Sequence, residues 1–132
     1  MPDSFFDSNV LLYLVDSDVA KATRAEALVA GGGVISVQVL NEIAHVCRRK
    51  ARFDWNQTHL LLDGLRDLLV VRPLTVEIHD AGLALAERYR LSAYNAMIVA
   101  AALAADCATL WSEDMQDGLS IEGRLQIRNP FL

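Results

Sequence analysis

Cysteine is scarce in this sequence, and the two that occur form no recognisable motif. Cys47 and Cys107 are the only cysteines among 132 residues, and they lack the paired spacing of a zinc site or a redox dithiol. Both lie in apolar stretches with a helical pattern, so we interpret them as reduced packing residues. A disulfide framework and a cysteine-ligated zinc site are therefore excluded, and reduced thiols favour the cytoplasm.

A long hydrophobic run is also missing. The longest alanine-rich stretch, residues 96–105, is about half as long as a membrane span requires. The N-terminal stretch has no basic flank, and Asp7 and Asn9 interrupt its apolar residues, which is unlike a signal peptide. We therefore expect a soluble, cytoplasmic protein with no membrane partner.

Positive charge is in the minority. The 17 acidic residues outnumber the 12 lysines and arginines and give a formal net charge of −5. Such a balance argues against broad electrostatic adhesion to nucleic acid or to an anionic membrane. Any contact with nucleic acid must therefore be local or mediated by a metal ion.

Apolar residues, in contrast, are plentiful. They make up 53% of the sequence, which excludes a disordered chain, and 132 residues bury enough surface to fold without disulfides. Short apolar runs alternate with longer helical patterns, which predicts an α/β fold with a central parallel sheet covered by helices. Strands are expected at residues 4–6, 34–35, 68–71 and 109–111, and helices at residues 8–15, 18–30, 37–50, 54–67, 75–90 and 94–105. We expect a single domain over residues 1–132.

Polar residues at the starts of three expected helices are candidate N-caps. Ser8 or Asn9 is expected to cap the first helix, and Asp16 or Ser17 the second. Ser36 is expected to cap the third, because an amphipathic pattern begins directly after it.

Acidic residues lie where two of the expected strands end. Asp7 and Asp114 follow strands, and Glu42 and Asn95 lie near the first turns of the helices that come next. Ligands bind outside the carboxyl ends of the strands in open α/β sheets, and oxygen ligands of this kind suit Mg²⁺ or Mn²⁺. Such an ion lowers the pKa of a bound water and neutralises phosphate charge. The spacing alone also allows a simpler interpretation, in which Asp7 and Asp114 cap helices and Glu42 lies on a solvated face.

Four segments of the sequence, in order, resemble the characteristic blocks of the PIN-domain family. They are FDSN at residues 6–9, SVQVLNE at residues 36–42, LSAYNAMIVAAA at residues 91–102 and LWSEDMQDG at residues 110–118. The first resembles the Asp-Ser-Asn or Asp-Thr-Asn motif of that family, and the second places its glutamate six residues after the serine. The resemblance covers nearly the whole chain, and four ordered blocks are more specific than any one of them.

The resemblance implies both a fold and a function. The expected fold is a three-layer α/β/α PIN-like domain with a central parallel sheet. The expected function is that of an Mg²⁺- or Mn²⁺-dependent endoribonuclease, a VapC-like toxin that is controlled by a small cognate antitoxin and that forms a homodimer. Asp7, Glu42 and Asp114 fall on the acidic site positions of the family, and RNA is the expected substrate.

Asn95 departs from the family pattern, which has an aspartate at this position. An amide oxygen coordinates a hard cation but brings no charge, so we expect a weaker metal site. Asp117 is a candidate fifth ligand that partly substitutes for the lost charge, or else a solvated loop acid. Three explanations are open: the protein is a natural variant of low activity, the asparagine is an introduced inactivating substitution, or the third block is misaligned. The matching Ser92 and Tyr94 argue against a misalignment.

The one basic cluster has two interpretations. Arg48, Arg49, Lys50 and Arg52 follow Glu42 on the same expected helix, where they would contact RNA phosphates or complement the negative end of the helix dipole. Trp55 and Trp111 are interpreted as core or interface residues rather than base-stacking platforms.

Two other functions fit parts of the sequence. A receiver-like signalling domain is also α/β with acids at strand ends, but it needs a lysine late in the chain, and no lysine follows Lys50. A catalytically silent PIN-fold binding module that acts through its antitoxin remains an alternative, because Asn95 permits it. RNA cleavage in added Mn²⁺ distinguishes this module from an enzyme.

Overall fold

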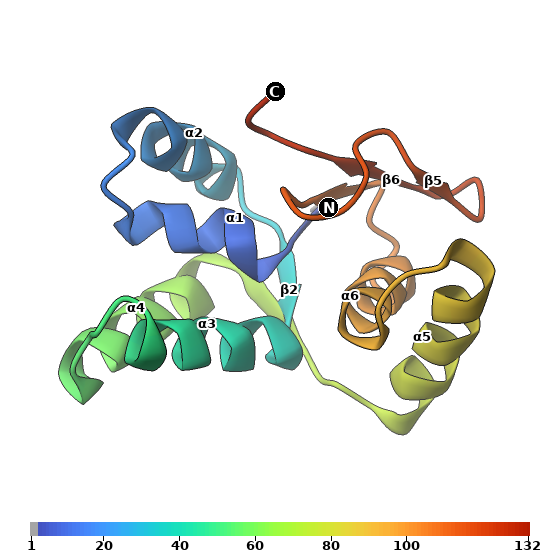
Figure 1. Ribbon diagram of the computed structural model, residues 1–132, viewed down its shortest axis with the longest axis horizontal. Helices are drawn as coiled ribbons and strands as arrows, with labels where there is room; N and C mark the ends of the chain where they lie inside the picture. Colours follow the sequence, from blue (N-terminus) through green and yellow to red (C-terminus); the bar gives the residue numbers. More distant parts are fainter. Residues whose placement is uncertain (1–2) are drawn as a thin grey trace.

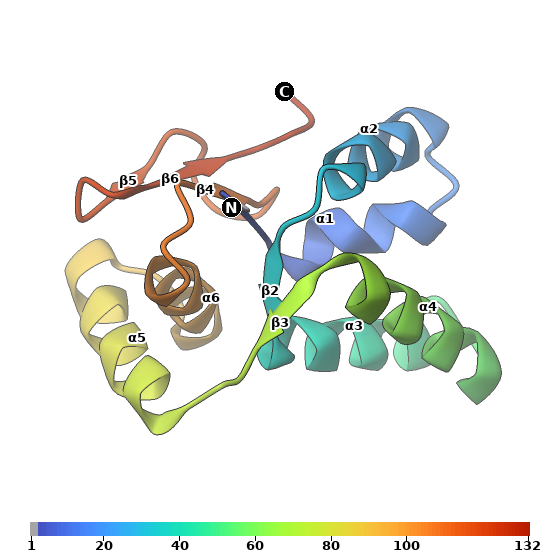
Figure 2. The ribbon, with the colours of Figure 1, turned by 180° about the vertical axis from the view of Figure 1, so that it is seen from behind.

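One six-stranded sheet forms the centre of the protein in the computed structural model, which describes residues 3–132 (Figures 1 and 2). The strand order is β3-β2-β1-β4-β6-β5. The strands are β1 (Ser4–Phe6), β2 (Val34–Ser36), β3 (Val70–Arg72), β4 (Thr109–Trp111), β5 (Ser120–Ile121) and β6 (Leu125–Arg128). All neighbouring pairs are parallel except β5 and β6. The expected mostly parallel sheet is therefore confirmed.

Helices cover both faces of this sheet. In both views α5 and α6 lie on one side of the sheet and α1 to α4 on the other (Figures 1 and 2). The helices are α1 (Ser8–Leu12), the 3-10 helix η1 (Tyr13–Val15), α2 (Val19–Ala30), α3 (Val37–Arg49), α4 (Trp55–Leu68), α5 (Val76–Tyr89) and α6 (Ala93–Ala104). The predicted α/β/α layering is confirmed. Among the helices of residues 3–132, none is both long enough and apolar enough to cross a membrane.

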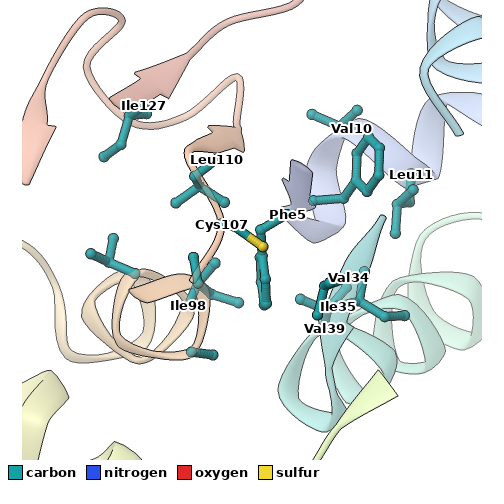
Figure 3. Close-up of a cluster of buried hydrophobic side chains, with 14 of the residues drawn as sticks. Phe5, Val10, Leu11, Val34, Ile35, Val39, Ile98, Cys107, Leu110 and Ile127 are labelled. Atoms are coloured by element: carbon teal, nitrogen blue, oxygen red, sulfur yellow. The ribbon is translucent and has the colours of Figure 1, made fainter. Parts of the chain in front are cut away.

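The central strands form because their residues are apolar on both faces. Phe5, Ile35 and Leu110 have no exposed surface, as expected for strands of a parallel sheet that helices cover on both sides. Phe5 lies at the centre of the core, between Ile98 of α6 and Val39 of α3 (Figure 3). The register pairs Phe5 with Leu110, so the residues that follow β1 and β4 leave the sheet side by side.

Two of the predicted helix caps are wrong. Asp7, rather than Ser8 or Asn9, caps α1, because its Oδ1 accepts a hydrogen bond of 2.8 Å from the backbone N–H of Ser8. The alternative interpretation of Asp7 as a helix cap is thereby confirmed. Asp18 caps α2, because it accepts from the backbone N–H of Lys21 at 3.1 Å. The predicted cap Ser36 is confirmed at the start of α3.

The two C-terminal strands, β5 and β6, are not predicted by the sequence. β6 adds to the edge of β4 in parallel, and β5 folds back on β6 through a turn in which Glu122 and Gly123 have positive φ angles of 55° and 64°. Two consecutive positive φ angles are characteristic of a tight hairpin. Leu125 and Ile127 are buried while their neighbours are exposed, an alternation too short to be distinctive.

The two cysteines are free and buried. Cys107 lies in the core beside Phe5 and Ile98 (Figure 3), and burial is the first cause that raises the pKa of its thiol to about 11. Their interpretation as packing residues is therefore confirmed.

Candidate active site

The carboxyl ends of β1, β2 and β4 bring the predicted acidic residues to one edge of the sheet. Asp7 directly follows β1, and its backbone N–H donates to the carbonyl oxygen of Trp111, the last residue of β4, at 2.9 Å. Glu42 lies in the second turn of α3, which begins where β2 ends. The segment 112–114 leaves β4 at the same edge.

Asp7 is buried, and hydrogen bonds hold both of its oxygens. Only 3% of its surface is exposed. Oδ1 accepts from the backbone of Ser8, while Oδ2 accepts from Ser112 Oγ at 2.8 Å and from Asn9 Nδ2 at 3.1 Å. A carboxylate held from three directions has a fixed orientation, which suits a ligand or a catalytic group.

Glu42 is linked to Asp7 through Ser8. Ser8 Oγ donates to Glu42 Oε1 at 2.7 Å, while the backbone N–H of the same serine donates to Asp7. On the other side, Gln38 Nε2 lies 3.1 Å from Glu42 Oε2 and 3.0 Å from the carbonyl oxygen of Tyr94. The two carboxylates therefore belong to one hydrogen-bonded group.

The electrostatics of Asp7 show that negative charges gather around it. Its pKa is raised from 3.8 to about 6, first by burial and then by repulsion from Glu42 and Asp114, while hydrogen bonds from Ser112 and Ser8 lower it. Asp114 itself is exposed. Because both carboxylates repel the negative charge of Asp7, they disfavour its ionised form.

The other two predicted site residues, Asn95 and Asp117, lie in different parts of the structure. Asn95 is partly buried in the first turn of α6. It is next to Tyr94, whose carbonyl oxygen accepts a hydrogen bond from Gln38. Within residues 3–132, the side-chain amide of Asn95 makes no hydrogen bond. Asp117 lies apart, because its Oδ1 accepts from the backbone N–H of Asn129 at 2.7 Å. Asp117 thus anchors the C-terminal segment.

The side chains do not form a ready-made metal triad. Within the described residues, no three histidine, cysteine, aspartate or glutamate side chains lie close enough together to hold an ion. The available donors are nonetheless carboxylate and amide oxygens, which are the ligands that Mg²⁺ and Mn²⁺ prefer. A cavity of about 620 Å³ opens beside Glu42, and Ser8, His45, Leu74 and Tyr94 are among the residues that line it. The donor chemistry therefore fits a hard divalent ion.

Sequence reasoning missed a second group of residues that fixes the loop after β4. Lys21 Nζ of α2 lies 2.7 Å from Glu113 Oε2, and Tyr13 donates to Glu113 Oε1 at 2.6 Å. The backbone N–H of Glu113 donates to Asn9 Oδ1 at 3.0 Å. Asn9 thereby connects this loop to Asp7. No local sequence signal predicts these contacts, because Lys21 and Glu113 are 92 positions apart.

The comparisons with known proteins agree on the fold. The model of the PIN domain family matches residues 4–116. A toxin-antitoxin complex from Klebsiella pneumoniae is 19% identical with a TM-score of 0.74, over 96% of this chain and 97% of that one. The Mycobacterium tuberculosis toxin VapC20, described as cleaving the sarcin-ricin loop, is 17% identical with a TM-score of 0.67, over 84% and 89%. DNA-bound VapBC from Salmonella typhimurium is 14% identical with a TM-score of 0.72, over 98% and 99%. No curated protein sequence matches this chain significantly.

Proposed function

Because this chain belongs to the PIN-domain family, we propose that it is a metal-dependent endoribonuclease and the VapC-like toxin of a toxin-antitoxin pair. The observation that carries the proposal is the buried carboxylate of Asp7, which Ser8 links to Glu42 and Ser112 links to the loop of Asp114. RNA is the proposed substrate because a protein of similar fold is described as cleaving the sarcin-ricin loop.

Four residues are proposed to hold Mg²⁺ or Mn²⁺, namely Asp7, Glu42, Asn95 and Asp114. The ion would lower the pKa of a bound water and would place positive charge opposite the negatively charged phosphate. Ser112 and Asn9 fix the direction of the Asp7 carboxylate, and Gln38 holds Glu42. Burial raises the pKa of Asp7 to about 6, and a bound cation would lower it by stabilising the charged form.

Asn95 weakens this proposed site without removing it. Its amide oxygen is a suitable neutral ligand, but an aspartate there would add one negative charge. Asp117 is not part of the proposed site, because its carboxylate already holds the backbone of Asn129.

The proposed antitoxin binds beside the acidic group. A cavity of about 370 Å³ opens between α1, η1 and the end of α3, where Leu12, Val15 and Val46 provide apolar surface and Asn9 and Glu113 provide polar groups. An amphipathic segment suits such a cavity, and a basic side chain on it would complement the acidic residues. The structures of similar fold include a toxin-antitoxin complex.

A homodimer is also proposed. Exposed apolar side chains lie around α5 and at the rim of the larger cavity, with Leu74 43%, Val76 72%, Leu83 46% and Tyr94 74% exposed. Such surface is commonly covered by a partner subunit.

RNA cleavage tests the proposed function directly. We expect the chain to cleave a structured RNA in Mn²⁺, Asp7→Asn to abolish this cleavage and Asn95→Asp to increase it. Asp117→Asn is the matched control, because it removes an acid of the same loop that lies outside the site. If RNA stays intact in Mn²⁺ even with Asn95→Asp while an antitoxin still binds, the protein is the silent binding module instead.

A further inference from the structure

At the C-terminal end of α3, a group of positive charges lies beside an exposed tryptophan, which is the first residue of α4. We call this the basic-aromatic end, and it consists of Arg48, Arg49, Lys50, Arg52 and Trp55, all of which are exposed. Trp55 is 60% exposed, so it is not a core residue. The guanidinium carbon of Arg48 lies 4.2 Å from the centroid of the Trp55 ring, and its Nη1 donates to the carbonyl oxygen of Phe53 at 2.7 Å. The stacked cation and ring are thus held in place while both side chains remain exposed.

Within the part of the chain that the structure describes, these charges have no acidic partners. In residues 3–132 the ion pairs are Lys21 with Glu113, Arg88 with Glu122 and Arg124 with Asp106. The four cations of the basic-aromatic end lie outside these pairs and within five positions of one another. They form a local positive charge on a chain whose formal net charge is −5. Local positive charge of this kind attracts phosphate.

The helix dipole explains only part of this arrangement. Arg48 and Arg49 lie in the last turn of α3, where a cation is stabilising. Arg52 lies beyond the helix, in a left-handed backbone conformation with φ 56°, so the dipole gives no reason for its charge. The dipole also does not explain the exposed indole of Trp55, since burying such a ring is favourable.

The basic-aromatic end adjoins the candidate active site. Glu42 and Lys50 are eight positions apart along α3, or about 12 Å at 1.5 Å per residue. Lys50 also lines the smaller cavity together with Asn9 and Glu113. A strand of RNA bound beside Glu42 can therefore extend along α3 to these charges.

We propose that the basic-aromatic end binds single-stranded RNA beside the bond to be cleaved. Trp55 and the guanidinium of Arg48 stack an unpaired base, while Arg49, Lys50 and Arg52 contact phosphates. A duplex fits less well, because its bases are already stacked within the helix. The inference rests on the proposed function, since it takes RNA as the substrate, and it adds that the RNA is unpaired next to the site.

Binding without metal tests this proposal separately from cleavage. The probe is a fluorescently labelled single-stranded RNA of about ten nucleotides, and its anisotropy is measured in EDTA with the RNA checked for integrity. We expect Trp55→Ala to weaken binding at least about five-fold and Trp55→Phe to retain most of it, because the smaller ring still stacks. A duplex of the same sequence should bind more weakly than the single strand.

Charge substitutions complete the test. Arg49→Ala and Arg52→Ala should each weaken binding and reduce the slope of log affinity against log salt by about 0.7 for each phosphate that the protein no longer neutralises. Arg66→Ala is the matched control, because Arg66 is an exposed cation of α4 outside the basic-aromatic end, and it should bind the RNA as the unchanged chain does. Circular dichroism verifies that each variant is folded.

The outcomes separate this inference from the proposed function. If the chain cleaves RNA in Mn²⁺ but Trp55→Ala binds RNA as tightly as the unchanged chain, the stacking surface is overturned and the nuclease remains. If Trp55→Ala dissociates a dimer or loses an antitoxin peptide without a change in RNA affinity, the surface is a protein interface and the proposal is wrong. If RNA binding depends on Trp55 but no cleavage occurs, the surface is supported and the nuclease proposal fails.

Discussion

Ser112 Oγ donates a hydrogen bond of 2.8 Å to Oδ2 of Asp7, although 105 positions separate the two residues. The bond fastens the loop after β4 to the residue after β1, and both side chains are buried. It also lowers the pKa of Asp7, against the larger effect of burial. The hydroxyl group of Ser112 therefore favours the charged form of Asp7.

Removing the hydroxyl group should change both the pKa of Asp7 and the stability of the protein. In Ser112→Ala we expect the pKa of Asp7 to rise above about 6, because its charged form loses a donor. The free energy of unfolding at pH 7 should fall by about 1 to 3 kcal/mol, since the bond is to a charged group. Carboxyl titration by NMR and denaturant unfolding measure the two effects. Ser120→Ala, at an exposed serine of β5, should show neither, and an unchanged Asp7 pKa in Ser112→Ala would contradict the inferred role of the bond.

The raised pKa of Asp7 makes the metal-free protein less stable as the pH rises. The native pKa of about 6 exceeds the ordinary 3.8, so the native state holds the proton more tightly than the unfolded state. The resulting stabilisation is fully present below about pH 4 and is lost as the pH rises through 6. A shift of this size corresponds to about 3 kcal/mol.

Asp7→Asn tests this contribution, because it removes the charge and keeps the shape, although its amide N–H₂ replaces an oxygen that accepts hydrogen bonds from Ser112 and Asn9. We expect the variant to be more stable than the unchanged chain at pH 7.5 in EDTA, by up to about 3 kcal/mol, and the difference to disappear near pH 4. Thermal unfolding across this pH range is the measurement. A stability difference that does not vary with pH would mean that Asp7 does not titrate as inferred.

Asn95→Asp should strengthen the binding of Mg²⁺. A fourth carboxylate adds attraction to a doubly charged ion in a partly desolvated pocket, so we expect an affinity gain of about ten-fold or more. Calorimetric titration with Mg²⁺ measures it. Asn41→Asp is the matched control, since Asn41 lies on α3 and lines the cavity beside Glu42, and the substitution adds the same charge at a position not proposed as a ligand. Equal gains in the two variants would show that position 95 contributes only general charge.

The ion pair between Lys21 and Glu113 should position the loop that carries Asp114. Burial raises the pKa of Glu113, but the hydrogen bonds from Lys21 and Tyr13 lower it more. We expect Glu113→Gln and Lys21→Met to weaken Mg²⁺ binding several-fold at unchanged secondary structure, because the loop loses its attachment to α2. Arg88→Met is the control. It breaks the ion pair between Arg88 and Glu122, whose atoms are 2.9 Å apart, and because this pair is not part of the site, Mg²⁺ affinity should stay unchanged. Should Arg88→Met and Lys21→Met weaken Mg²⁺ binding equally, the effect of Lys21 is one of general charge or stability.

Local patterns in the sequence determined most of the framework. Apolar runs indicate β1, β2 and β4, helical periodicity indicates the main helices, and the amphipathic pattern after Ser36 indicates its role as a cap. These features depend on residues within a few positions of one another, so the sequence carries them directly. The same reasoning located Asp7 and Asp114 at strand ends, which is where a parallel sheet gathers its ligands.

Only the tertiary structure decided how the individual acids differ. It buried Asp7 and left Asp114 exposed, and it turned Asp117 toward the backbone of Asn129. It also joined Lys21 to Glu113 and left Trp55 exposed against Arg48. The physical reason is that burial and pKa are set by neighbours from distant parts of the chain. Those neighbours meet only when strands β1 and β4 pair and the helices pack on the sheet, and no local periodicity encodes their distances.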